Sequence, residues 1–152
     1  MKISYFLSPA NVMLDIRASD KTQLLRQLSA LAATEVQLDP EAVTAQIVKR
    51  EELGSTGVGD GVALPHARLA GLKSPFGLLA RLRRGIDFEA IDEQPVDIIF
   101  LLLLPESANG EQLNALACVA RALRDHKTLA RIRAAVNPEA VFKAITKLSA
   151  TA

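Results

Sequence analysis

The sequence predicts an α/β fold in which helices flank both faces of a mixed central β-sheet, within a single compact domain spanning residues 1–152. Three observations lead to this prediction. Segments with the apolar periodicity of helices alternate with short apolar segments typical of strands. The segment 95–105 is apolar at consecutive positions, as expected for a strand covered on both faces. A turn near Gly85 indicates a hairpin, which makes the sheet mixed.

The first predicted elements are a short strand at 12–14 and a long helix. Ser19 is the expected N-cap of this helix, which runs to about Thr34. The spacing of an amphipathic helix predicts which side chains it buries. These are Leu24, Leu25, Leu28, Leu31 and Ala32.

A second helix begins at Asp39-Pro40, because a capping side chain is followed there by proline at the first helical position. It should end at residue 51 or 52. A loop with four glycines, 54–61, comes next, and a short strand at 62–64 then leads to Pro65-His66. The side chains expected on the buried face of the helix are Val43, Ile47 and Val48.

The second half of the chain contributes two strands and three helices. A strand is expected at 76–82, with the hairpin at 85–92, before the long strand at 95–105. A helix should begin near Gly110, and two shorter helices cover about 127–134 and 138–147. The residues expected on the inner face of the first of these helices are Leu113, Leu116, Ala117, Ala120 and Leu123.

Composition and charge exclude several classes of protein. Lysine and arginine total 18 against 17 aspartates and glutamates, without a dense basic run, which argues against a nucleic-acid binder. Cys118 is the single cysteine, so neither an intramolecular disulfide nor a cysteine-based zinc site is expected. The longest apolar run, 98–104, is far shorter than the roughly 20 residues that a membrane span needs. We therefore expect a cytoplasmic protein without a bound metal or cofactor.

Residues 50–66 carry the most promising chemistry. Glycine-rich backbone N–H groups can bind an anion, and the hydroxyls of Ser55 and Thr56 add donors. Arg50 offers a bidentate fork for a phosphoryl group. His66 follows a strand and the rigid Pro65, and imidazole is a good nucleophile near neutral pH because its ordinary pKa is about 6.5. This combination suits phosphoryl transfer through a covalent intermediate.

The residues alone leave a plainer reading open. Most glycine-rich loops are only turns, and this one is not a Walker A loop because no Gly-Lys-Ser/Thr follows. A histidine at the end of a strand is often an ordinary polar side chain.

The order and spacing of these residues resemble the active-site signature of one protein family. The runs 52–57, Glu-Leu-Gly-Ser-Thr-Gly, and 63–66, Ala-Leu-Pro-His, are similar to enzyme IIA domains of the mannitol/fructose class of the bacterial phosphoenolpyruvate-dependent phosphotransferase system. The likeness is greatest to the nitrogen-regulatory subgroup, and it continues through 94–97 and the strand ending at Pro105.

The resemblance implies a fold, roles and partners. The phosphorylated histidine of the family corresponds to His66, its phosphoryl-binding arginine to Arg50, and a polar position six residues before the histidine to Asp60. The family fold is a mixed sheet flanked by helices. The implied donor is the phosphocarrier HPr or its nitrogen-branch paralogue, and the implied acceptor is a regulated protein or an enzyme IIB.

One departure from the family is Gln112, which stands where most members carry a second histidine. Glutamine can donate a hydrogen bond to a phosphoryl oxygen but brings no positive charge. A hydrogen bond to a charged group contributes about 1.5–3 kcal/mol, against about 0.5–1.5 kcal/mol for a neutral one. The difference predicts slower or redirected transfer. His126, the other histidine, lies about four turns further along and does not replace it.

Two alternative functions remain open from the sequence. The domain could be a sugar-specific enzyme IIA that passes the phosphoryl group to a separate enzyme IIB. The leading interpretation is a free-standing phosphoryl carrier with a regulatory output, since no IIB or IIC segment is expected within these residues. The domain could also be a regulatory binding module that works without phosphate, an alternative that Gln112 keeps open.

Other polar residues have plainer expected roles. Cys118 is expected in packing, and His126 in solvent. Arg81, Arg83 and Arg84 are expected on a solvated edge, or as a docking surface. Glu51 and Glu52 are not expected to form an acid–base pair, because adjacent helical residues point apart.

Overall fold

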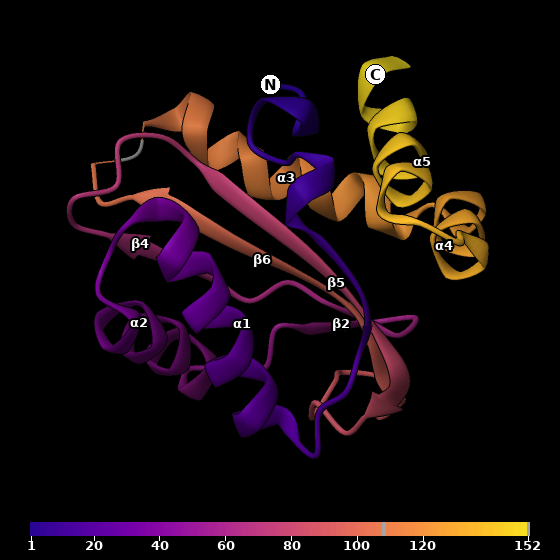
Figure 1. Cartoon of the computed structure of the whole chain (residues 1–152), viewed down its shortest axis with the longest axis horizontal. Coiled ribbons are helices and arrows are strands. Elements are labelled where there is room, and N and C mark those ends of the chain that lie inside the picture. Colours follow the sequence, from indigo (N-terminus) through magenta and orange to yellow (C-terminus); the bar gives the residue numbers. More distant parts are fainter. Residues whose placement is uncertain (108, 152) are drawn as a thin grey trace.

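One sheet separates two helical layers in the computed structural model (Figure 1), which describes residues 1–107 and 109–151 and, at 111–113 and 148–151, the backbone alone. Within those residues the sheet has six strands in the order β1-β5-β6-β3-β2, with β4 also paired to β6. β6 runs antiparallel to β5 and parallel to β3 and β4, so the prediction of a mixed α/β sheet is confirmed. The strands are β1 (Val12–Ile16), β2 (Gly57–Gly59), β3 (Val62–Ala63), β4 (His66–Leu69), β5 (Phe76–Ile86) and β6 (Val96–Pro105).

Helices cover both faces, as predicted (Figure 1). α1 (Lys21–Val36) and α2 (Pro40–Glu52) lie on one face, and α3 (Gly110–Arg124), α4 (His126–Ala134) and α5 (Pro138–Thr151) lie on the other. Two short 3-10 helices, η1 (Ile3–Tyr5) and η2 (Pro9–Asn11), precede β1.

Side chains of β6 belong to both hydrophobic cores, which explains why the sequence of β6 is apolar at consecutive positions. Ile99, Leu101 and Leu103 pack in the cluster that contains the buried side chains of α1 and α2. Ile98 and Phe100 pack in the opposite cluster, with residues of α3, α4 and α5. Successive side chains of a strand point to opposite faces, so a strand covered on both faces must be apolar at consecutive positions.

β3 and β4 form one interrupted parallel strand beside β6. Val62 pairs with Ile98 and His66 with Leu102, so the register is the same on either side of residues 64 and 65. Leu102 N–H donates to the carbonyl of Pro65 at 2.9 Å, which holds the interruption against β6. His66 is therefore the first residue of β4, a strand that the sequence analysis did not predict.

The glycine-rich segment is also more ordered than the predicted loop, because it contains β2. Gly57 pairs antiparallel with Ala63, and its carbonyl accepts a hydrogen bond from Ile91 N–H at 3.1 Å. A Cβ on Gly57 would lie 2.8 Å from both Cα and Cβ of Ala90. The segment needs glycine there because β2 packs directly on the backbone of the β5–β6 connection.

The start of α1 differs from the prediction by one residue. Asp20, not Ser19, is the N-cap, and its carboxylate accepts a hydrogen bond from Gln23 N–H at 2.8 Å. Ser19 instead donates through both its N–H and its hydroxyl to Oε1 of Gln23. Leu31 is 36% exposed, and Ala33 is buried instead. The four-residue spacings from Leu25 and Ser29 lead to Ala33 and leave Leu31 at the edge of the buried face.

One further boundary and one helix face differ from the prediction. β5 extends to Ile86, so Gly85 lies within the strand and the connection to β6 follows it. The pairing register with β6 shifts between Arg81, which is opposite Ile98, and Ile86, which is opposite Val96. On α3 the fully buried side chains are Ala115, Val119, Ala122 and Leu123, whereas Ala117 is exposed and the side chain of Leu113 lies outside the described residues.

Gly57→Ala is expected to lower the free energy of unfolding by about 1–3 kcal/mol, the usual cost of overpacking a site that backbone atoms enclose. Urea denaturation measures the change. Gly110→Ala is the control, because a Cβ there meets no atom within 4 Å. Equal stability of the two variants would contradict the close packing of β2 on residue 90.

Candidate functional site

His66 is half-buried, and its orientation is fixed by a contact two residues away. Its Nδ1 lies 2.9 Å from the carbonyl oxygen of Leu64. A carbonyl can only accept a hydrogen bond, so Nδ1 must carry the proton. In the neutral ring the lone pair is then on Nε2, and this nitrogen is the candidate nucleophile.

The surroundings of His66 keep the ring neutral. Burial is the main cause that lowers the pKa of His66 below its ordinary 6.5, and the Arg50 guanidinium lowers it further. The Leu64 carbonyl and the Glu51 carboxylate act in the opposite direction without reversing the shift. A neutral imidazole at pH 7 is the form that a nucleophile requires.

Arg50 lies in the last turn of α2, near enough to His66 to influence its charge. Its Nη1 donates to the carbonyl of Gly54 at 3.0 Å, which ties the side chain to the start of the glycine-rich segment. A guanidinium has five N–H donors. The remaining donors give Arg50 the capacity to bind a phosphoryl group, so the structure brings together two of the predicted site residues.

The glycine-rich segment directs its polar groups inward. Gly54 N–H donates to the carbonyl of Glu51, Thr56 N–H to the Glu51 carboxylate and Gly57 N–H to the hydroxyl oxygen of Ser55. The hydroxyl of Ser55 donates to the carbonyl of Phe88 at 2.9 Å, and that of Thr56 donates to Glu51 at 2.6 Å. The backbone cradle expected from the sequence is therefore not formed by these groups. Ser55 and Thr56 instead hold the segment in place.

Asp60 lies away from His66, in the turn between β2 and β3. Its carbonyl accepts a hydrogen bond from Arg133 at 2.6 Å, and its Oδ2 lies 3.5 Å from Nε2 of His126. The residues of β6 opposite Val62 and His66 are Ile98 and Leu102, about 13 Å apart at the rise of a strand. Asp60 precedes Val62 and thus belongs to the far end of the sheet, where it contacts α4.

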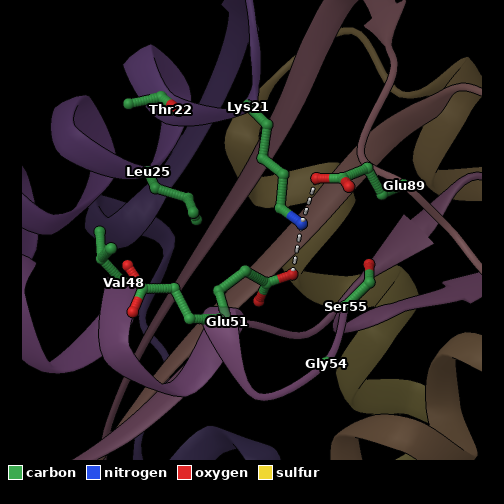
Figure 2. A pocket seen from close by; sticks show the side chains of 9 residues that line it. Lys21, Thr22, Leu25, Val48, Glu51, Gly54, Ser55 and Glu89 are labelled. Carbon is green, nitrogen blue, oxygen red and sulfur yellow. Dashed lines mark ion pairs between the residues drawn. The ribbon is translucent and has the colours of Figure 1, made fainter.

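Glu51 is a residue of the site region that sequence reasoning missed. Its side chain is only 5% exposed, and it forms an ion pair with Lys21 at 2.9 Å (Figure 2). The signal was present in the sequence, because Val43, Ile47 and Glu51 follow at four-residue spacing on the buried face of α2. Glu52 is exposed, so the two carboxylates do point apart.

Three arginines expected on a solvated edge divide into two groups. Arg81 donates to the carbonyls of Ile132 and Ala135 at 2.8 and 2.7 Å, and so it caps the carboxyl end of α4. Arg83 and Arg84 are exposed and, with Arg17, line a hollow of about 480 Å³. That hollow lies at the β5 end that pairs with the start of β6, away from His66.

The remaining candidates have structural settings or are not described. Cys118 is half-buried, and its Sγ lies 2.9 Å from the carbonyl of Met1. The side chain of Gln112 lies outside the described residues. Within residues 1–107 and 109–151, no group of three histidine, cysteine or acidic side chains is placed to hold a metal ion. In the same part of the chain no helix combines the length and the apolar character that crossing a bilayer requires.

Residues 5–148 match the family model described as phosphoenolpyruvate-dependent sugar phosphotransferase system, EIIA 2. The chain belongs to this family. The resemblance inferred from residues 50–66 is thereby confirmed. Domains of this phosphotransferase-system family accept phosphoryl groups from HPr-like donors and pass them to enzyme IIB or to regulated partners.

Several known proteins are similar to the chain, to different degrees. The nitrogen regulatory protein of Bradyrhizobium diazoefficiens is 42% identical over 152 residues, which are 100% of this chain and 99% of the relative. The crystal structure of the nitrogen regulatory protein IIA-Ntr from Neisseria meningitidis has a TM-score of 0.90 at 35% identity, covering 95% of this chain and 99% of that one. The fructose-specific EIIABC component of Bacillus subtilis is 28% identical over 148 residues, 97% of this chain and 23% of that protein.

The His66 ring is expected to titrate below pH 6.5, which proton NMR of its ring signals measures. His66→Gln assigns the signals, because the chain has 2 histidines. Since the unfolded state then binds the proton more readily, the stability from this group is full above pH 6.5 and declines as the pH falls toward the folded pKa. Titration of His66 at or above 6.5 would contradict the assignment of burial as the dominant effect.

Proposed function

We propose that the chain is a phosphoryl carrier of the phosphotransferase system in which His66 accepts the phosphoryl group on Nε2. The observation that carries the proposal is the hydrogen bond from Nδ1 to the Leu64 carbonyl, because it leaves the Nε2 lone pair available beside Arg50. In the transfer, a bond forms between Nε2 and phosphorus while the nitrogen–phosphorus bond of the donor breaks. The electrons of that bond return to the donor nitrogen.

The surrounding groups suit the charge that develops in this step. His66 keeps its Nδ1 proton, and the ring becomes cationic once Nε2 is bonded to phosphorus. The Leu64 carbonyl then accepts a stronger, charge-assisted hydrogen bond. Negative charge spreads over the equatorial oxygens of the phosphoryl group in the transition state, and Arg50 is the described cation best placed to stabilise it.

The output is proposed to be regulatory, in the nitrogen branch of the system. The relatives named nitrogen regulatory proteins support this, since 42% identity to one of them exceeds the 28% to a fructose-specific component. The donor would be HPr or its nitrogen-branch paralogue, in the cytoplasm. A phosphoryl group adds about −1.5 to −2 charges at pH 7, which is enough to change which protein docks at the site.

Incorporation of phosphate tests this function. With phosphoenolpyruvate, enzyme I and either HPr or its paralogue, wild type and His126→Ala should gain one phosphoryl group, whereas His66→Ala should gain none. Intact mass at neutral or alkaline pH protects an acid-labile phosphohistidine. Incorporation into His66→Ala would overturn the assignment, and a wild type that gains nothing from either donor would favour a phosphate-independent binding module. Onward transfer to a purified enzyme IIB would instead indicate the sugar-specific role.

Gln112→His is expected to speed phosphoryl acceptance by roughly five- to tenfold, because a charge-assisted hydrogen bond replaces a neutral one, a gain of about 1 kcal/mol in the transition state. Single-turnover rates with the phosphorylated donor measure the effect. Unchanged rates with both donor and acceptor would show that the second imidazole has no role in this chain.

A further inference from the structure

Glu51 is a buried carboxylate with both oxygens occupied. Oε1 accepts a hydrogen bond from Thr56 N–H at 2.8 Å, and Oε2 accepts one from the Thr56 hydroxyl at 2.6 Å. Two bonds from one residue to one carboxylate fix both the position and the rotation of that residue. Thr56 is itself 4% exposed, so the pair lies inside the protein.

A hydrogen-bonded series continues from Thr56 to the imidazole. The carbonyl of Thr56 accepts a hydrogen bond from Leu64 N–H at 2.9 Å, and the carbonyl of Leu64 lies 2.9 Å from Nδ1 of His66. The next carbonyl along the chain, that of Pro65, accepts a hydrogen bond from Leu102 N–H of β6. The bond from Leu64 N–H to the Thr56 carbonyl thus links the residue that contacts His66 to the residue that Glu51 holds.

Lys21 supplies the charge that a buried carboxylate needs. Its Nζ lies 2.9 Å from Oε1 of Glu51 and 3.5 Å from Oε1 of Glu89 (Figure 2). The same nitrogen lies 4.6 Å from the centre of the Phe88 ring. Lys21 is the first residue of α1, where the helix dipole disfavours a cation. A lysine at this position is explained by Glu51, since an unpaired buried carboxylate would be strongly destabilising.

We propose that Glu51 is a positioning residue for phosphoryl transfer, which acts through Thr56 and Leu64 to hold the His66 ring in the tautomer with Nε2 unprotonated. This inference rests on the proposed function of His66. Glu51 is not a catalytic base in this arrangement, because its oxygens are bound to Thr56 and Lys21. Its negative charge also favours the cationic ring that forms when Nε2 is phosphorylated.

The decisive readout is the tautomer of His66, which nitrogen-15 chemical shifts of the ring report directly. At pH 8, where the ring is neutral, wild type is expected to show the form with a proton on Nδ1. Glu51→Gln should give a mixture of tautomers and accept phosphate from the donor about 10- to 100-fold more slowly, the usual loss when the groups orienting a functional histidine are removed. Glu52→Gln is the matched control, because it removes an exposed carboxylate from the adjacent position.

A second pair of variants covers the case in which Glu51→Gln does not fold. Thr56→Val keeps the shape of the side chain but removes the hydroxyl that donates to Glu51, and it should shift both tautomer and rate in the same direction. Thr56→Ser restores the hydroxyl and should recover most of both. A wild-type tautomer in Glu51→Gln or Thr56→Val, with or without a slower rate, would overturn the proposal. The tautomer can be measured without any donor, so failure of wild type to take up phosphate would count against the proposed function alone.

Discussion

The register of residues 62–69 along β6 determines where His66 lies and which backbone groups surround it. Val62 and His66 pair with Ile98 and Leu102 in the same register on either side of a proline. A slip of one residue would turn each side chain of β4 to the opposite face of the sheet, away from the core that Ala67 and Leu69 join. Because β6 is buried on both faces, that slip is costly. The interruption therefore stays at residues 64 and 65. There the N–H of Leu64 donates to the Thr56 carbonyl, and the carbonyl of Leu64 contacts Nδ1 of His66.

The polar groups of the glycine-rich segment fix the position of that segment and are not free to bind an anion. N–H groups between residues 54 and 57 that face inward are satisfied by Glu51 and Ser55, so the segment behaves as a support for the imidazole. Among the described groups, Arg50 then remains the candidate for anion binding, since its charge acts on His66 from the last turn of α2. The absence of a side chain at Gly57 lets β2 pack directly against Ala90, which further fixes the position of the segment.

Helices and strands with a clear pattern of buried residues could be predicted from the sequence. The positions of the site residues could be predicted only in part. β6 and the start of α2 at Asp39-Pro40 follow from patterns that a single segment contains. The place of Asp60 does not, because the turn from β2 to β3 reverses the chain and carries Asp60 toward α4. Glu51 lies at the four-residue spacing of the buried apolar side chains of α2. Its burial was missed because only apolar residues were expected on that face. Ser19 and Asp20 are both capping residues, and only the backbone decides between them.

The charges around His66 indicate that the proposed phosphorylation would act mainly by changing the charge of the surface. The chain has a net charge of +1, and a phosphoryl group adds about −1.5 to −2 charges. Lys21 compensates the charge of the Glu51 carboxylate, so this carboxylate does not repel an incoming phosphoryl group strongly. Arg50 and the cationic ring would offset part of the new charge. Because the Nδ1 contact to Leu64 suits both the free and the phosphorylated ring, the backbone need not rearrange, and a partner would distinguish the two states by charge at the surface.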